Sequence, residues 1–507
     1  MALFVMGAWL VCVELWAGED YVLRYRVDVD TVGHYLNVEL LYESEVSVGR
    51  DVLLKMPVWA PGYYLIVDFP KYVCDFCVTD DEGREVQWEK VGKNGWRFFP
   101  QCRRTRVSYR VYANERSVAE CRVENGVAFV APNGVFMYVD GDVGHGVEVS
   151  YVLPSGWGHV SSGLRRKMDG ASREEGRVTF VADDFDVLYD SPVLLGNQRV
   201  IRFEHEGHGY ELALETPDGL DETSFVEDFR RMVSATTRLM GDVPYEDYCL
   251  IHLGLGQGGL EHKNSQACYT GGSFRFDSRE DYLSHLSFTT HEYFHLYNVK
   301  CIRPVELGPF DYDREVLTPL LWVSEGFTVY YESRNLLRAG LVDSDYVLAA
   351  LSEFIGTIEG SEGHRHMSLR QSSYDIWLNF FNRAANGRDV RISYYDKGPI
   401  LGLLFDIDIR RKTDGQRSLD DLMRLLYNRY YKELGRGFTE REFWSAAEEV
   451  AGQPLPTLRR YVDTTDEIDY EEMLNDVGLT LDRDTWTLRR MGKPGKRALQ
   501  LRQQMGL

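Results

Sequence analysis

Residues 289–297 read TTHEYFHLY and contain the pattern His-Glu-x-x-His. On an α-helix, His291 and His295 lie one turn apart on the same face, so both imidazoles can bind one metal ion. Glu292 lies one position further round the helix, where its carboxylate can act on a water molecule at that metal without binding the metal itself. Residues 285–300 contain no Pro or Gly, and their apolar side chains recur at three- and four-residue intervals, which predicts a helix.

A third metal ligand is expected within residues 318–332, which read TPLLWVSEGFTVYYE. The opening Thr-Pro pair is a typical helix start, and a helix is predicted over residues 318–337. Glu325 lies among apolar residues, where an unpaired carboxylate is costly to bury unless it binds a metal or a buried cation. Glu332 follows seven residues later on the same face, where it either orients a ligand imidazole or is an ordinary exposed carboxylate. Zinc suits this ligand set. The prediction is one Zn²⁺ per chain, bound by His291, His295 and Glu325.

The composition is that of a folded protein with two or three domains. The chain has 507 residues, of which 44% are hydrophobic, and a net charge of −22. This charge argues against nucleic acid as a partner. Residues 1–20 are a candidate signal segment, with a buried N-terminal strand as the alternative. The apolar run is too short for stable membrane insertion, and export to the periplasm or the exterior is favoured over a cytoplasmic location.

Three further segments follow this candidate signal. Residues 21–197 show alternating polar and apolar residues between turn-forming residues, which predicts an antiparallel β domain. Helical patterns dominate residues 198–481, and helices are expected at residues 225–239, 285–300, 318–337, 399–412 and 418–431. Residues 482–507 are basic, contain Gly492, Pro494 and Gly495, and are expected to form a tail.

The pair His-Glu-x-x-His and Ser-Glu-Gly-Phe-Thr resembles the gluzincin metallopeptidases, and within them the glycyl aminopeptidase family. Residues 56–66, 190–192, 394–398 and 418–421 carry further matches in the family's order. The resemblance implies an α+β architecture, in which an N-terminal β domain precedes a mostly helical, thermolysin-like catalytic domain. It also implies a zinc aminopeptidase that removes small N-terminal residues such as Gly or Ala. Relatives usually carry a C-terminal PDZ domain, for which too little sequence follows residue 481.

The same resemblance assigns two further roles. Residues 258–262 read GGLEH and are similar to the Gly-x-Met-Glu-Asn exopeptidase motif, which assigns Gly259 and Glu261 to substrate binding. Glu261 would bind the free α-amine, while His262 departs from the Asn of that motif. The glycines here also fit a dinucleotide fingerprint, but no convincing helix follows them. Residues 394–398 read YYDKG and resemble a Tyr-Glu-Lys-Gly motif, which selects Tyr395 as the hydrogen-bond donor to the tetrahedral intermediate.

The prediction is therefore a zinc-dependent aminopeptidase that acts on peptides. Glu292 is its general base, and Tyr395 stabilises the developing oxyanion. A zinc endopeptidase on the same site is the main alternative. A non-catalytic peptide-binding protein is the other, and oligomeric state is left unassigned.

Overall fold

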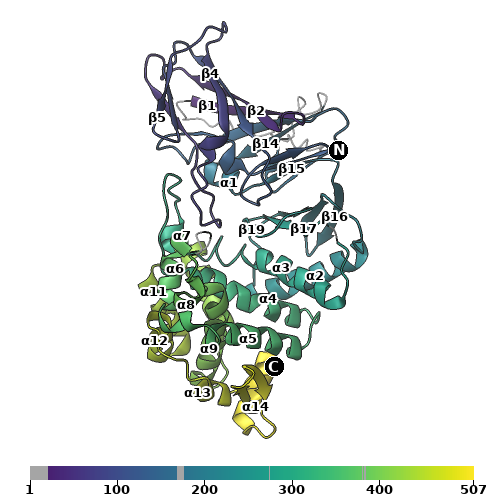
Figure 1. Ribbon diagram of the computed structural model, residues 1–507, viewed down its shortest axis with the longest axis vertical. Coiled ribbons are helices and arrows are strands. Elements are labelled where there is room, and N and C mark those ends of the chain that lie inside the picture. The colour runs from purple at the N-terminus through teal and green to yellow at the C-terminus, as the bar shows by residue number, and fades with distance from the viewer. Residues whose placement is uncertain (1–20, 168–175, 273, 380, 382–383) are drawn as a thin grey trace, which may run out of the picture.

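The computed structural model describes residues 21–167, 176–272, 274–379, 381 and 384–507. The candidate signal segment, residues 1–20, lies outside the described residues. The chain runs from a β-rich half through a five-stranded sheet into a helical half, and the C-terminus lies at the far end of the helices (Figure 1). This order confirms the predicted α+β architecture.

The β domain is built on a seven-stranded sheet, within the residues described. Strand β2 shows why the sequence folds this way, because every second side chain is buried and the intervening ones are more exposed. Of the described pairs in this sheet, only β1 and β11 are parallel. In spatial order the strands are β13 (Arg165–Arg166), β14 (Arg177–Ala182), β11 (Val147–Val152), β1 (Tyr21–Asp30), β2 (Tyr35–Ser44), β7 (Arg104–Tyr112) and β4 (Val73–Thr79).

Two four-stranded sheets and a short helix complete this domain among the described residues. One sheet contains β10 (Tyr138–Val139), β3 (Val52–Lys55), β6 (Gly95–Phe98) and β5 (Trp88–Val91). The other contains β12 (His159–Ser162), β15 (Val193–Gly196), β9 (Val127–Val130) and β8 (Arg122–Glu124). Helix α1 (Phe185–Tyr189) lies between β14 and β15 in the chain.

The second half begins with a five-stranded sheet. In spatial order its strands are β16 (Arg199–His205), β17 (His208–Leu214), β18 (Asp247–Leu253), β20 (Ser265–Tyr269) and β19 (Gly259–Glu261). Helix α2 (Glu222–Met240) starts where the Asp221 side chain accepts a hydrogen bond from Ser224 N, and it ends at Gly241, whose φ of 79° suits glycine. Helix α3 (Arg279–Phe294) contacts β19 and β20.

The remaining helices form the lower half of the molecule in Figure 1. They are α4 (Phe327–Arg338), α5 (Ser344–Glu359), α6 (Leu369–Tyr374), α7 (Ile376–Asn379), α8 (Gly387–Val390), α9 (Tyr394–Lys412), α10 (Leu419–Leu426), α11 (Glu440–Ala451), α12 (Pro456–Asp463), α13 (Tyr470–Asn475) and α14 (Lys496–Met505). Two π-helical turns, Trp322–Gly326 (η5) and Tyr427–Glu433 (η7), precede α4 and follow α10. In the described parts of the chain, no helix is both long and apolar enough to cross a membrane.

Two stretches differ from their sequence-based description. The helix predicted from residue 318 begins at Leu321, and its first turn is the π-helical η5 rather than α-helical. The segment described as a tail is folded, because it forms β22 (Thr487–Arg490), paired with β21 (Leu479–Asp482), and then α14. Leu501 and Met505 of α14 are buried in the helical core, so apolar contacts hold this basic segment in place.

The described residues contain two large hydrophobic cores, one mainly in each half. The boundary is crossed by the loop after β3. Val58, Trp59 and Tyr64 belong to the core of the helical half. Trp59 Nε1 donates to the carbonyl of Asp311 over 2.8 Å, and its ring packs edge-on against Trp377. The β domain is therefore anchored in the half that carries the candidate site.

Candidate active site

The two histidines of the motif face each other at the end of α3. His295 is the C-terminal cap but keeps helical dihedral angles, so it stays one turn beyond His291. Their Nε2 atoms lie 3.0 Å apart. His295 Nδ1 lies 2.7 Å from the carbonyl oxygen of Asn298, and His291 Nδ1 lies 3.1 Å from the Glu332 carboxylate. Because these oxygens accept, each Nδ1 carries the proton and each Nε2 directs a lone pair at the other ring.

Glu325 completes this group from the π-helical turn η5. Its Oε2 lies 3.1 Å from His295 Nε2 and 3.7 Å from His291 Nε2, and the side chain is buried. Two facing lone pairs and a buried carboxylate repel one another unless a cation lies between them. Two imidazoles and one carboxylate also match the protein ligands of a catalytic zinc site, and Glu332 supplies the outer contact that fixes a ligand ring. The residues present therefore fit a zinc ion.

Asn298 joins the two ligand-bearing segments, and sequence reasoning missed it. Its side-chain amide donates to the carbonyls of Val323 and Ser324 in η5 over 2.8 and 3.0 Å. Its own carbonyl accepts from His295. The Asn298 side chain thus pairs with the carbonyls of a π-helical turn while its backbone orients a ligand imidazole. The available signal is one polar residue in the otherwise apolar run Leu-Tyr-Asn-Val directly after His295.

Glu292 lies beside the metal ligands and against strand β19. A Cβ atom on Gly259 would lie 2.2 Å from Glu292 Oε1, so only glycine lets the strand approach this carboxylate. Among the described residues, no group donates a hydrogen bond to the Glu292 side chain. Burial raises the pKa of Glu292 to about 7, against the opposing effect of His291 and His295. A carboxylate with this pKa can both accept and release a proton near neutral pH.

Glu261 ends β19 and is also buried. Ligand atoms of Glu261, Glu292 and His295 all lie within 4.8 Å of one another. The β domain reaches this carboxylate, because a Cβ atom on Gly62 would lie 2.6 Å from Glu261 Oε1. Lys300 Nζ lies 4.0 Å from the same oxygen, Oε1. Gly259 and Glu261 are thus placed together with the zinc-site residues, as the motif led us to expect.

The charge of Glu325 acts on three buried tyrosines, where one was predicted. Burial raises the pKa of Tyr395, Tyr394 and Tyr64 well above the ordinary value, and the charge of Glu325 adds to the effect on each. All three are therefore hydrogen-bond donors at neutral pH. Tyr394 and Tyr64 were not predicted, since a lone buried Tyr carries no sequence signal among 31 tyrosines.

A close backbone contact joins helix α9, which carries Tyr395, to the turn η5, which carries Glu325. A Cβ atom on Gly398 would lie 2.5 Å from the Cα of Gly326, and the reverse substitution would meet Gly398 Cα at the same distance. The two glycines let α9 and η5 approach more closely than any other residue pair allows.

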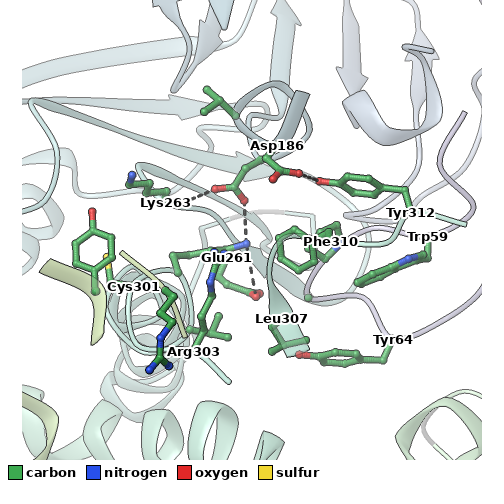
Figure 2. A pocket seen from close by; sticks show the side chains of 18 of the residues that line it. Trp59, Tyr64, Asp186, Glu261, Lys263, Cys301, Arg303, Leu307, Phe310 and Tyr312 are labelled. Carbon is green, nitrogen blue, oxygen red and sulfur yellow. Dashed lines mark hydrogen bonds and ion pairs between the residues drawn. The ribbon is translucent and has the colours of Figure 1, made fainter. Parts of the chain in front are cut away.

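A cavity of about 260 Å³ opens beside Glu261, between the loop after β3 and the residues that follow α3. Figure 2 shows Trp59, Tyr64, Phe310 and Tyr312 along one side of it, with the Tyr64 hydroxyl pointing inward. Lys263 and Arg303 lie on the opposite side. Both halves of the protein therefore line the space next to Glu261.

The sequence matches two models of one peptidase family. The Peptidase M61 N-terminal domain model matches residues 24–197, and the M61 glycyl aminopeptidase model matches residues 284–401. Together these ranges cover more than half of the chain. A comparison with curated proteins found no match.

Solved aminopeptidases share the fold. An aminopeptidase N family protein from Idiomarina loihiensis aligns with a TM-score of 0.84 at 25% identity, over 91% of this chain and 79% of that one. An M1 zinc metallopeptidase from Deinococcus radiodurans aligns with a TM-score of 0.52 at 15% identity, over 88% and 94% of the two chains. Aminopeptidase A from Legionella pneumophila, solved with aspartic acid, aligns with a TM-score of 0.52 at 14% identity, over 88% and 49%. The last two likenesses concern the fold alone.

Proposed function

Because the chain belongs to the M61 glycyl aminopeptidase family and is a zinc metallo-aminopeptidase, we propose that it releases single residues from the free N-terminus of peptides. The proposed ligands of its one zinc ion are His291, His295 and Glu325. Small N-terminal residues, Gly or Ala, are the proposed substrates, on the strength of the family resemblance. Amino acids bound to solved neighbours, such as the aspartic acid of aminopeptidase A, accord with peptide substrates.

The spacing between Glu261 and the catalytic residues supports an aminopeptidase most directly. Within one residue, the amine nitrogen and the carbonyl carbon are about 2.5 Å apart. An amine anchor must therefore lie within a few ångströms of the groups that attack the first peptide bond. Glu261 meets this requirement, because its carboxylate lies within 4.8 Å of both Glu292 and His295. An endopeptidase would instead need room there for further residues.

Each side chain of the site has a distinct proposed role. Glu261 binds the α-ammonium group and so places the first carbonyl beside Glu292. His291, His295 and Glu325 would hold a zinc ion, which when bound would supply Lewis-acid chemistry for polarising a carbonyl and acidifying water. Glu292 takes the proton of the attacking water and passes it to the leaving amine. Tyr395 donates to the carbonyl oxygen as negative charge develops there. Glu332 fixes the ring of His291.

A panel of anilides tests this proposal. We expect hydrolysis of glycyl and alanyl 4-nitroanilide, none of their N-acetylated forms, and loss of activity with a chelator that zinc restores. Glu261→Gln should raise KM for the free-amine substrates by about tenfold or more, because it removes a charged partner of the ammonium group. Cleavage of the acetylated substrates, or of internal bonds in an amine-blocked peptide, would identify an endopeptidase instead.

A further inference from the structure

A chain of charged groups links the β domain to the amine anchor. Asp190, directly after α1, holds Lys300 with 2.8 Å between Oδ1 and Nζ. Lys300 Nζ in turn lies 4.0 Å from Glu261 Oε1. In Figure 2 the dashed line that ends at the Glu261 carboxylate marks the second of these contacts. The side chain of Lys300 is only 10% exposed, so water screens this chain weakly.

Asp190 also fixes the chain segment that follows Glu261. Its Oδ2 accepts from the backbone N–H of Lys263 over 2.8 Å, and its Oδ1 lies 3.1 Å from His262 Nδ1. Burial alone would raise the pKa of Asp190, but Lys300 and His262 hold it below the ordinary value. One charged carboxylate of the β domain thus holds both the end of β19 and the lysine beside Glu261.

Glu261 needs such a partner because of its surroundings. It is buried close to Glu292, and Glu325 adds a third carboxylate nearby. Like charges that share a buried site repel one another. The loop at Gly62 also lies against the Glu261 carboxylate, because a Cβ atom on Gly62 would come within 3 Å of both carboxylate oxygens. Lys300 is the lysine that lies against Glu261 in this arrangement.

We propose that Lys300, held by Asp190, is a positioning residue for Glu261 in amine recognition. Lys300 lies nearest Oε1 and fixes the orientation of the carboxylate toward the α-ammonium group of the peptide. The β domain thereby takes part in selecting a free N-terminus. This inference rests on the proposed role of Glu261, and it adds a residue pair that contacts neither the metal nor the scissile bond.

Steady-state kinetics on glycyl 4-nitroanilide with zinc-loaded, full-length variants test this proposal. Lys300→Met keeps most of the side-chain volume but removes the charge, and it should raise KM about tenfold while kcat stays within about threefold. Lys300→Arg should restore most of the affinity. Lys412→Met at the end of α9 is the matched control, because Lys412 is also a shielded lysine paired with an aspartate, Asp408, over 2.7 Å, but does not line the cavity. It should leave KM unchanged.

A double-mutant cycle with Glu261→Gln separates positioning from general destabilisation. If Lys300 acts through Glu261, Lys300→Met should add no further rise in KM once Glu261 is Gln. Equal effects in both backgrounds, or an effect on kcat alone, would overturn the proposal. If Lys300→Met does not fold, Asp190→Asn tests the same chain and should raise KM several-fold, and an unchanged KM would overturn the proposal.

The cycle also distinguishes failure of this inference from failure of the proposed function. A raised KM in Glu261→Gln with an unchanged KM in Lys300→Met overturns only the role of Lys300. An unchanged KM in Glu261→Gln overturns the amine anchor itself, and the role of Lys300 with it.

Discussion

At the scale of single residues, the candidate site depends on a glycine, Gly259, as much as on its charged side chains. Glu292 is a buried carboxylate without a hydrogen-bond donor among the described residues, and strand β19 lies against it at Gly259. An alanine at that position would clash with the carboxylate oxygen. The strand therefore covers Glu292 without pairing with it. Because no described residue donates a hydrogen bond to it, the Glu292 carboxylate remains available to accept a proton.

Replacing Glu292 by Gln tests this role with almost no change in shape. The amide fits the same space against Gly259, and the metal ligands are untouched. Zinc content should remain at the wild-type level, while kcat should fall at least about a hundredfold because a general base is lost. Metal analysis of the purified variant, together with anilide kinetics, measures both. Loss of zinc with hydrolysis intact would assign Glu292 to the metal instead of the proton.

At the scale of elements, one backbone contact sets the distance between a proposed metal ligand and a proposed proton donor. The π-helical turn η5 carries Glu325, and helix α9 carries Tyr395. Gly326 and Gly398 let the two backbones touch, and Asn298 pairs with two carbonyls of η5. π-helical turns occur often at functional sites. Here the turn places a carboxylate where an ordinary α-helix over residues 318–337 was expected.

Gly398→Ala should therefore separate α9 from η5. The added methyl group would meet backbone atoms of Gly326 at 2.5 Å, and backbone cannot rotate away as a flexible side chain can. We expect about 1–3 kcal/mol of lost stability from this overpacking. We also expect at least about a tenfold loss of kcat from the displaced Tyr395.

Gly356→Ala in α5 is the control, because its methyl group would meet only Trp486 Cβ at 3.6 Å, an ordinary contact. That change should stabilise the protein by about 0.5–1 kcal/mol. Equal unfolding midpoints for the two variants would contradict this account.

At the scale of the whole molecule, the sequence predicted what depends on local pattern. Alternation predicted the β half, and three- and four-residue periodicity predicted most long helices, such as α2 and α9. What could not be predicted depends on contacts between distant segments. The loop at Trp59 enters the core of the other half, and the basic residues 496–505 are held by burial of Leu501. The same limit applies to the site, because a motif supplied Glu261, whereas Tyr64 has no local pattern that separates it from structural tyrosines and Asn298 has only its place in an apolar run.

Two buried histidines make the stability of the whole chain sensitive to acid. His252 of β18 is fully buried, and no described residue forms a hydrogen bond with either of its ring nitrogens. It packs edge-on against His285 of α3, with ring centroids 5.3 Å apart, beside Phe274. Burial lowers the pKa of His285 to about 4 and that of His252 well below the ordinary value of about 6.5. Both rings are therefore neutral in the folded protein at pH 7.

Acid should accordingly destabilise the fold at a higher pH than that at which carboxylates of ordinary pKa are protonated. Above pH of about 6.5 neither the folded nor the unfolded chain protonates these rings, so their contribution to stability is fully present. As the pH falls from 6.5 towards 4, the unfolded chain binds protons that the folded chain excludes. Stability should then fall by up to about 1.4 kcal/mol per pH unit for each histidine.

His285→Phe keeps an aromatic ring in the cluster and should remove the contribution of His285 to this slope. Unfolding free energies of the zinc-loaded wild type and variant at pH 7, 6 and 5 measure the difference, and the acid sensitivity of the zinc ligands cancels in that comparison. His366→Gln, at an exposed site, should follow the wild type. The same pH dependence of the unfolding free energy in His285→Phe and the wild type would show that this buried pair does not cause the acid sensitivity.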